Sequence, residues 1–442
     1  MNQHYTIAGG GLVGSLLAVL LAKQGKRVTI YERRADMRLK TIEAGRSINL
    51  ALSHRGRKAL AAAGLEDEIM KIAIPMYGRV IHALDGTTFY QPYSNSGEAI
   101  YSVSRSDINK RLLTLAESQT GVEIHFNSTI KKVDLSAKKI ELQQGDTHFE
   151  MPYDMLLGGD GAYSPLRTAM MKTERFNYSQ HYEAHGYKEL NIPPDANQNT
   201  QLQREALHIW PRDSFMLIAL PNMSGDFTCT LFLSLEGEIS FKSLDSDEKI
   251  MKFMTENFAS ATALMPNVLQ QFSNNPTANL VTVRCYPWAF QQSALLLGDA
   301  AHAIIPFYGQ GMNCGFEDAR ILSELLADEP INTVFDTFQK LRKPNADAIA
   351  DMACDNFIEM RDLSGKADFQ AKKKIEKTLT DTYPELFTSQ YAQVTFSHTP
   401  YAVAQRNGTK QWDLLNALYD KRLDMHIDKD KINSILQTLE KV

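Results

Sequence analysis

The feature that most constrains the fold of this chain is the stretch GGGLVG near its N-terminus, which contains Gly9-x-Gly11-x-x-Gly14. The stretch follows a strand-like segment, HYTIAG (4–9), and opens an apolar segment with the pattern of a helix (12–24). In such a turn the first glycine makes the turn itself, the second lets the backbone approach a pyrophosphate, and the third lets helix and strand pack closely. The sequence therefore predicts a phosphate-binding turn between a strand and a helix.

An acidic residue closes the next predicted strand, RVTIYE (27–32). Glu32 lies 23 residues after Gly9, where a carboxylate can accept hydrogen bonds from the ribose hydroxyls of an adenosine. The pyrophosphate would then lie at the helix N-terminus, where backbone N–H groups and the helix dipole favour an anion. Strand, helix, second strand and terminal acid together predict a dinucleotide site. The motif does not distinguish NAD from FAD, and the sequence contains no second GxGxxG after a strand.

The rest of the chain contains two styles of strand. DMLLGGDG (154–161) and SALLLGD (293–299) are buried strands that run into glycine turns, as the first strand does. Between them, HGYKEL, ALHIW, FMLIALP and FTCTLFLSL are rich in aromatic and β-branched residues, which favours an antiparallel sheet. The pattern that follows is helical, over residues 311–327, 336–363 and 369–382.

We therefore expect an α/β protein with a Rossmann-type nucleotide-binding domain, an inserted antiparallel-sheet substrate domain and a C-terminal helical region. The predicted boundaries are 1–75, 101–180 and 281–330 for the nucleotide-binding domain, 76–100 and 181–280 for the sheet domain, and 331–442 for the helical region.

Three local predictions concern helix starts and a hairpin. Ser53 starts a helix that runs to Ala63 and stops at Gly64, and Ser106 is a good N-cap for a helix over 107–119. EIHFNSTIKKVDL and KIELQQG alternate polar and apolar residues, as the strands of a hairpin do.

Charge and cysteine usage exclude several classes of protein. The formal net charge of -5 over 442 residues gives no basic field for nucleic acid. The four cysteines form no CxxC pair, which argues against a zinc site or a disulfide framework and fits a reducing compartment. The N-terminus lacks the pattern of a secretory signal, and no apolar run approaches the roughly 20 residues of a membrane span. We expect a soluble, cytoplasmic protein without a membrane anchor.

The segment GDAAHAIIPFYGQGMNCG (298–315) raises the question of a catalytic Asp–His pair. Asp299 and His302 lie three residues apart in a predicted loop, so their spacing does not imply that they face each other, and no Ser or Cys nucleophile is arranged with them. A helix N-terminus preceded by glycines binds anions or carbonyl oxygens, and Asp299 at a strand end suits a ribityl hydroxyl. The segment is therefore interpreted as one wall of a cofactor site, with His302 in a structural role.

Three motifs in this order, GxGxxG, a mid-chain DG at a strand end, and GDAAH…P…GQGMN, resemble those of the single-component FAD-dependent aromatic hydroxylases, the family typified by p-hydroxybenzoate hydroxylase. Further blocks resemble the members that hydroxylate the amino acid L-kynurenine. These blocks are GRSINLALSHRGRKAL, GRVIH, QPY, YSVSRSDIN, HGYKEL, LHIWPR, ALPN, TLFL and PFYGQGMN, with weaker ones, NFIEM and VTFSHTPYA, that reach residue 402.

The resemblance implies site residues. Arg79 and Tyr93 match the pair that binds the substrate carboxylate, and a guanidinium fork with a phenol suits that anion. Asn356 and Tyr401 match further substrate positions, while Phe307 and Tyr308 would wall the aromatic pocket. The expected cofactor-binding residues are Gly9, Gly11, Val13, Gly14, Glu32, Arg33, Arg34, Ala35, Ala51, Arg105, Ile130, Asp160, Asp299, Pro306, Gly311, Met312 and Asn313.

The resemblance also implies the chemistry. NADPH binds transiently and reduces tightly bound FAD, and O2 then gives a flavin C4a-hydroperoxide that hydroxylates L-kynurenine to 3-hydroxykynurenine, a step of tryptophan catabolism and of quinolinate and NAD biosynthesis. The substrate's amino group activates its own ring, so no catalytic residue beyond the flavin and no metal is expected.

Other interpretations stay open from the residues alone. The chain could be a flavin hydroxylase of another aromatic acid, a non-catalytic flavin-binding sensor, or an NAD-dependent dehydrogenase. A halogenase is disfavoured because YPWAF (286–290) is not a WxWxIP segment. Most substrate-site residues also have a plainer explanation: a solvated arginine for Arg79, a packed loop aromatic for Tyr93, a polar helix residue for Asn356, and core packing for Phe307 and Tyr308.

Overall fold

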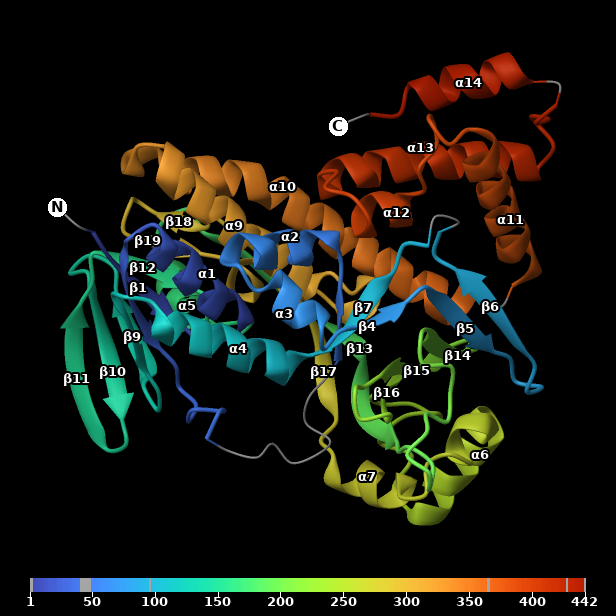
Figure 1. Ribbon diagram of the computed structural model, residues 1–442, viewed down its shortest axis with the longest axis horizontal. Helices are drawn as coiled ribbons and strands as arrows, with labels where there is room; N and C mark the ends of the chain where they lie inside the picture. The colour runs from blue at the N-terminus through green and yellow to red at the C-terminus, as the bar shows by residue number, and fades with distance from the viewer. Residues whose placement is uncertain (1–2, 40–48, 95–96, 364–365, 427, 441–442) are drawn as a thin grey trace.

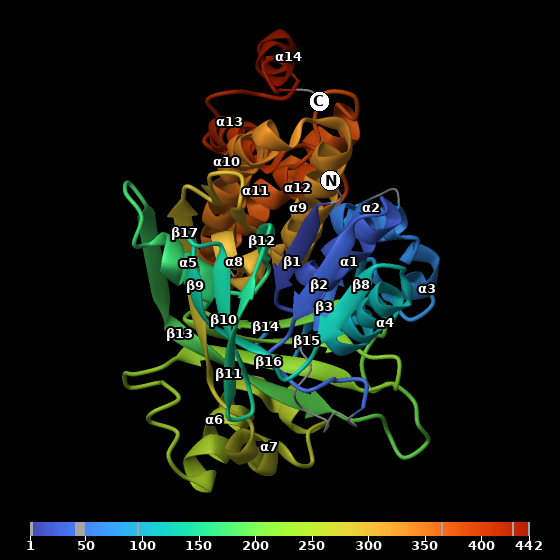
Figure 2. The ribbon, with the colours of Figure 1, turned by 90° about the vertical axis from the view of Figure 1, so that its left-hand side faces the viewer.

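The computed structural model describes residues 3–39, 49–94, 97–363, 366–426 and 428–440 (Figure 1). The predicted block GRSINLALSHRGRKAL begins outside these ranges, at residues 45–48. Two large sheets lie side by side in Figure 1, and in the view of Figure 2 one lies below the other, with a group of C-terminal helices at the top. This arrangement confirms the predicted α/β fold class.

The first sheet has six strands, and its five longer strands are parallel. In spatial order the strands are β18 (Ala289–Phe290), β19 (Ala294–Leu296), β12 (Met155–Gly158), β1 (His4–Ala8), β2 (Arg27–Tyr31) and β8 (Val122–His125). The short β18 pairs antiparallel at the edge. Strands from three distant parts of the sequence thus end together, and ligands of such sheets bind at the carboxyl ends of the strands.

Helices pack on this sheet because its strands are buried. Helix α1 (Leu12–Lys23) is buried along nearly its whole length, since it packs against α4 (Arg105–Ser118) and α9 (Gly311–Asp328) as well as the sheet. This explains why its sequence is apolar on every face rather than amphipathic. The shorter neighbouring helices are α2 (His54–Ala63), α3 (Glu66–Met70), α5 (Pro165–Met170) and α8 (Asp299–His302).

Two three-stranded sheets border the first. One has the order β11 (Thr147–Pro152), β10 (Lys139–Gln144), β9 (Thr129–Asp134), and the other the order β3 (Asn49–Leu52), β7 (Ile100–Ser104), β4 (Ile74–Met76). The predicted hairpin is correct for β9 and β10, which pair antiparallel. It is wrong for the preceding EIHF, because β8 pairs parallel with β2 and so belongs to the six-stranded sheet. The alternation of polar and apolar residues over four positions predicts a strand but does not show which sheet the strand joins.

The predicted N-cap Ser106 is also wrong. Helix α4 starts two residues earlier, with Ser104 as its N-cap, and the Ser104 hydroxyl accepts a hydrogen bond from the backbone N–H of Asp107 at 3.3 Å. Ser104 ends strand β7 with the extended backbone that an N-cap needs, whereas Ser106 is already helical. The helix that Ser53 was expected to start is confirmed, since α2 runs from His54 to Ala63.

The second large sheet has seven strands. In spatial order they are β17 (Ala278–Tyr286), β13 (Asn177–Ile192), β16 (Phe227–Ser234), β15 (Phe215–Pro221), β14 (Leu207–Arg212), β5 (Gly78–His82) and β6 (Thr88–Pro92). All neighbours are antiparallel except β14 and β5. Helices α6 (Asp247–Thr262) and α7 (Val268–Asn274) cover one face, and the other face turns toward the C-terminal helices.

Helix α10 (Ile331–Ile358) joins the two halves of the molecule (Figure 1). Val334, Phe335 and Phe338 belong to the core of the six-stranded sheet, whereas Met352 and Phe357 pack in the cluster beside the seven-stranded sheet. A π-helical turn (Glu359–Leu363) ends it. The remaining helices are α11 (Ala367–Thr382), α12 (Gln390–Thr395), α13 (Tyr401–Tyr419) and α14 (Lys429–Gln437). None of the helices in the described ranges is long and apolar enough to cross a bilayer.

Candidate active site

The glycine turn has the geometry that its sequence predicts. Gly9 has a φ of +96°, and a Cβ there would lie 2.7 Å from the carbonyl oxygen of Gly159. A Cβ on Gly14 would overlap the carbonyl oxygen of Gly9, so helix and strand can approach only because neither residue has a side chain. At Gly11, by contrast, a Cβ would meet no described atom within 4 Å. The space beside Gly11 is therefore open, as a pyrophosphate cradle requires.

Glu32 closes this cradle at the end of β2. Its carboxylate accepts hydrogen bonds from the backbone N–H groups of Gly10, at 2.8 Å, and Arg34, at 2.9 Å. These bonds fix the carboxylate beside the glycine turn and leave lone pairs for ribose hydroxyls. Arg33 and Arg34 are exposed and Ala35 is half-buried, so all three can border a bound nucleotide.

The three motifs meet at one place. A Cβ on Gly298 would lie 3.2 Å from the side chain of Val13, and one on Gly315 would lie 2.6 Å from it. A Cβ on Gly9 would lie 3.0 Å from the Cα of Asp160. The glycine turn, the DG turn and the GDAAH segment thus converge at the carboxyl ends of β1, β12 and β19, as expected for a ligand site.

Asp160 has a buried oxygen without a protein partner. One carboxylate oxygen accepts a weak hydrogen bond from the N–H of Leu166 at 3.4 Å, and the other has no hydrogen-bond partner among the described residues. Burial raises the pKa of Asp160 to about 6. Buried polar atoms in native proteins are nearly always hydrogen-bonded, so this oxygen is suited to a donor on a bound cofactor.

The start of helix α9 offers backbone donors. Gln310 precedes it without capping it by a side chain, and the first hydrogen bond of the helix runs from the N–H of Cys314 to the carbonyl of Gln310 at 2.8 Å. The N–H groups of Gly311, Met312 and Asn313 therefore have no partner within the helix. Such a helix start binds a carbonyl oxygen or an anion.

The side chain of Asn313 itself is committed to the protein. It donates to the carbonyls of Ala51 and Gly309 at 2.8 and 2.9 Å and accepts from the N–H of Ser53 at 2.9 Å. What Asn313 has left for a cofactor is its backbone N–H group. The bonds also hold β3, which carries Ala51, against the start of α9.

The other expected cofactor residues lie on elements that border the same region. Asp299 is exposed at the first residue of α8, Pro306 is exposed in the turn that follows, and Arg105 is exposed at the first residue of α4. Ile130 and Met312 are buried. Ile130 is a core residue of the first domain, so it can meet a cofactor only at the edge of that core.

Asp299 and His302 do not form a pair. They lie in the four-residue helix α8 rather than in the predicted loop, and His302 is buried whereas Asp299 is exposed. The Nε2 atom of His302 lies 2.5 Å from Asp318, whose carboxylate also accepts from the N–H of Gly298 at 3.0 Å. The expected structural role of His302 is supported, because the contact holds the turn that carries Asp299.

Asp318 belongs to a buried ionic network. Arg342 donates to Asp318 and to Glu317, each at 2.7 Å, and Arg55 donates to Glu317 at 2.8 Å. Although burial alone would raise it, His302 and Arg342 lower the pKa of Asp318 to about 2. The sulfur of Cys314 lies close enough for a metal site with His302 and Asp318, but the adjacent guanidinium disfavours a bound cation.

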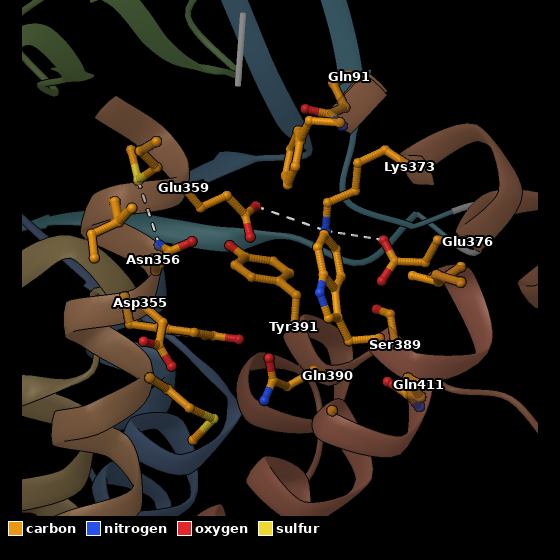
Figure 3. A pocket seen from close by; sticks show the side chains of 18 of the residues that line it. Gln91, Asp355, Asn356, Glu359, Lys373, Glu376, Ser389, Gln390, Tyr391 and Gln411 are labelled. Atoms are coloured by element: carbon orange, nitrogen blue, oxygen red, sulfur yellow. Dashed lines mark hydrogen bonds and ion pairs between the residues drawn. The ribbon is translucent and has the colours of Figure 1, made fainter. Parts of the chain in front are cut away.

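A cavity of about 520 Å³ lies between β5, β6, the π turn and the C-terminal helices (Figure 3). Arg79 on β5 stands over the rings of Tyr93, at 5.4 Å, and of Tyr391 on α12, at 5.0 Å, and the two rings stack at 5.3 Å. In the described chain, Nε of Arg79 and the hydroxyl of Tyr93 are buried without a hydrogen-bond partner. A partly buried guanidinium between two phenols, with its Nε shielded from solvent, is not a solvated surface arginine, and it calls for an anionic ligand.

Asn356 and Tyr308 also line the cavity. Nδ2 of Asn356 donates to the carbonyl of Phe307 at 2.6 Å, which ties α10 to the PFY turn just before α9. The cavity therefore adjoins the helix start that offers donors to a cofactor. Phe307 is not among the lining residues, since its ring stacks on Phe357 at 4.1 Å, beneath the cavity wall.

The structure does not bring Tyr401 to this cavity. Its side chain is fully buried, its hydroxyl donates to Gln310 at 2.9 Å, and Arg55 stands over its ring at 4.0 Å. Tyr391, which was not expected from the sequence, lies beside Arg79 and lines the cavity. The sequence signal for Tyr391 is weak: Ser389 is an N-cap that predicts the short helix α12, but nothing local shows where that helix docks.

Comparisons with known proteins agree with this geometry. The family model described as FAD binding domain matches residues 4–353. Among solved structures, 2-methyl-3-hydroxypyridine-5-carboxylic acid oxygenase has a TM-score of 0.67 at 18% identity, covering 89% of this chain and 96% of its own. Pseudomonas aeruginosa PqsL has a TM-score of 0.67 at 19% identity, covering 81% and 97%. Fold and site together define an FAD-binding oxidoreductase of the aromatic-hydroxylase class.

Curated relatives narrow the class. Kynurenine 3-monooxygenase of Dictyostelium discoideum is 45% identical over 97% of this chain and 96% of its own length. The enzyme of the same name from Myxococcus xanthus is 47% identical over 91% and 88%. The chain belongs to the kynurenine 3-monooxygenase family.

Proposed function

We propose that this chain is an FAD-dependent monooxygenase that uses NADPH and O2 to convert L-kynurenine into 3-hydroxykynurenine, a step of tryptophan catabolism that leads to quinolinate and NAD. In the balanced reaction, one aromatic C–H group, O2, NADPH and a proton are consumed, and one phenol, water and NADP+ are formed. The observation that carries the proposal is the partly buried Arg79, flanked by Tyr93 and Tyr391, in a cavity that adjoins the cofactor-binding turns.

The residues of the chain suit FAD. The open cradle at Gly11, the carboxylate of Glu32, the unpaired oxygen of Asp160 and the free N–H groups at the start of α9 match the pyrophosphate, the ribose and the polar edge of a flavin. When bound, FAD supplies the redox chemistry that activates oxygen.

The protein's part is to position the substrate and exclude water. Arg79 with the two phenols binds the carboxylate, since a guanidinium and O–H donors make charge-assisted hydrogen bonds. Ile81, Ile209 and Met352 give the cavity apolar walls for an aromatic ring. Asn356 fixes the PFY turn, and Tyr308 forms the wall toward the cofactor. With one end of the substrate anchored, the ring is held at a set distance from the flavin.

We further infer a cytoplasmic location, because the four cysteines are all unpaired. The domain boundaries given from the sequence are retained as a proposal, as are the cofactor-binding residues.

The test is NADPH oxidation by the purified yellow protein, with and without L-kynurenine, together with hydrogen peroxide measurement and mass analysis of the product. The proposal expects stimulation by L-kynurenine and a product heavier by one oxygen atom. Stimulation by 4-hydroxybenzoate in place of L-kynurenine would indicate a hydroxylase of another aromatic acid. A flavin-containing protein that oxidises no NADPH with any aromatic amino acid would favour a sensor, and a colourless protein would contradict the proposal.

A further inference from the structure

The cavity holds a second charged group beside the Arg79 site. Lys373 on α11 points into it, with its ammonium 3.1 Å from Glu376 and 3.7 Å from Glu359 (Figure 3). The first distance is a hydrogen bond, whereas the second is an ion pair beyond hydrogen-bond length. Glu359 therefore keeps its acceptor capacity for another donor, while Lys373 is already held by Glu376.

The position of Glu359 is set by an uncommon turn. It is the first residue of the π-helical turn that ends α10, one turn after Asn356, and both side chains line the cavity. Turns of this kind are rare and occur mostly at functional sites. The turn brings the carboxylate to the region of Arg79: Tyr93, Tyr391 and Glu359 together raise the pKa of Arg79 although its burial acts in the opposite direction.

The charge balance of the cavity favours a cation in its ligand. Among the described lining residues the cations are Arg79 and Lys373, and the partly buried carboxylates are Glu359 and Glu376, whereas Asp355 and Asp413 are exposed to solvent. A ligand carboxylate at Arg79 cancels one of the two cations. Lys373 then faces the two partly buried carboxylates of Glu359 and Glu376 alone, so a positive group on the ligand balances the second carboxylate.

We propose that Glu359 receives the α-ammonium group of the amino-acid substrate, so that the cavity selects α-amino acids over the corresponding acids without the amino group. Lys373 is the resident cation at Glu359 before the substrate binds. It stays bonded to Glu376 when the ligand's ammonium takes its place at Glu359, so no hydrogen bond has to break. This inference rests on the proposed function and names the specificity of the same site.

The test compares two ligands in the FAD-loaded enzyme: L-kynurenine and 4-(2-aminophenyl)-4-oxobutanoate, which lacks only the α-amino group. The dissociation constant of each is measured from the change in flavin absorbance, and KM from NADPH oxidation. One charge-assisted hydrogen bond corresponds to a difference of roughly 10- to 100-fold. We expect the wild-type enzyme to bind the des-amino acid weaker by this factor.

Glu359→Gln should raise the dissociation constant of L-kynurenine by the same factor. It should leave the dissociation constant of the des-amino acid within about twofold of the wild-type value. Asp413→Asn is the matched control, because it removes one carboxylate from the lining of the same cavity and leaves Lys373 bonded to Glu376. This variant should change the dissociation constants of both ligands by the same factor, so that their ratio stays at the wild-type value. Glu359→Asp retains the charge and should restore part of the discrimination.

An equal loss for both ligands in Glu359→Gln would show a merely structural role and overturn the inference, as would an unchanged affinity for L-kynurenine. Because binding is read without turnover, this result is separate from the proposed function. That proposal fails if wild-type enzyme binds L-kynurenine but releases no hydroxylated product.

Discussion

Replacing Arg79 with alanine should weaken substrate binding strongly and leave the cofactor site intact. The guanidinium lies against the rings of Tyr93 and Tyr391, and its Nε is buried without a hydrogen-bond partner in the described chain. Removing one partner of a buried, hydrogen-bonded charge pair costs about 2 to 5 kcal/mol. The two phenols remain as donors, so we take about 3 kcal/mol, which corresponds to a roughly 150-fold rise in KM for L-kynurenine.

The assay is the L-kynurenine dependence of NADPH oxidation, with FAD content measured by flavin absorbance. Arg79 lies on β5 of the seven-stranded sheet, away from the glycine turn, so FAD content should stay at the wild-type level. Arg79→Lys keeps the charge but loses the fork, and should give an intermediate KM. An Arg79→Ala enzyme with full FAD and unchanged KM would refute the assignment of the carboxylate site.

Three further predictions concern the scaffold. Asp318→Asn removes the buried carboxylate that joins His302 to Arg342 and should lower the free energy of unfolding by about 3 kcal/mol, measured by urea denaturation; an unchanged midpoint would contradict it. Gly14→Ala places a Cβ against the carbonyl of Gly9 and should yield protein with little bound FAD, measured as flavin absorbance per chain; full occupancy would show that the turn can yield. Burial and the adjacent His208 lower the pKa of His82 from 6.5 to about 4, so as pH falls the unfolded chain binds the proton first. Stability should therefore drop between pH 6.5 and 4, by on the order of 3 kcal/mol, and a flat profile in that window would exclude this contribution.

The cofactor site could be predicted from the sequence because its requirements are local. Gly9, Gly11 and Gly14 are needed by a turn a few residues long, and Glu32 follows at a distance set by one helix and one strand. The resemblance then placed the DG and GDAAH segments beside them, and the sheet order brings all three together.

The substrate site was predicted less completely because docking decides it. Arg79 lies on β5 and Tyr93 directly follows β6, the antiparallel partner of β5, so their proximity follows from one hairpin. Tyr391 and Tyr401 each lie at the start of a C-terminal helix, and only the packing of these helices directs one to the cavity and the other to Gln310. The role of Glu359 was likewise out of reach, since a π turn has no clear signature in sequence.

Helix α10 has a consequence for the length of substrate that the enzyme can accept. Its 28 residues span about 42 Å, with one end packed in the core beneath the cofactor turns and the other in the cavity wall. Helix α10 thereby fixes the distance between the cavity that binds the substrate carboxylate and the turns that bind the cofactor. A substrate longer by one methylene would push its ring about 1 Å past the reacting position, a displacement that can cost roughly 100-fold in rate. The enzyme should therefore discriminate between substrates by the number of carbon atoms between carboxylate and ring as strictly as it does by the carboxylate or the ring itself.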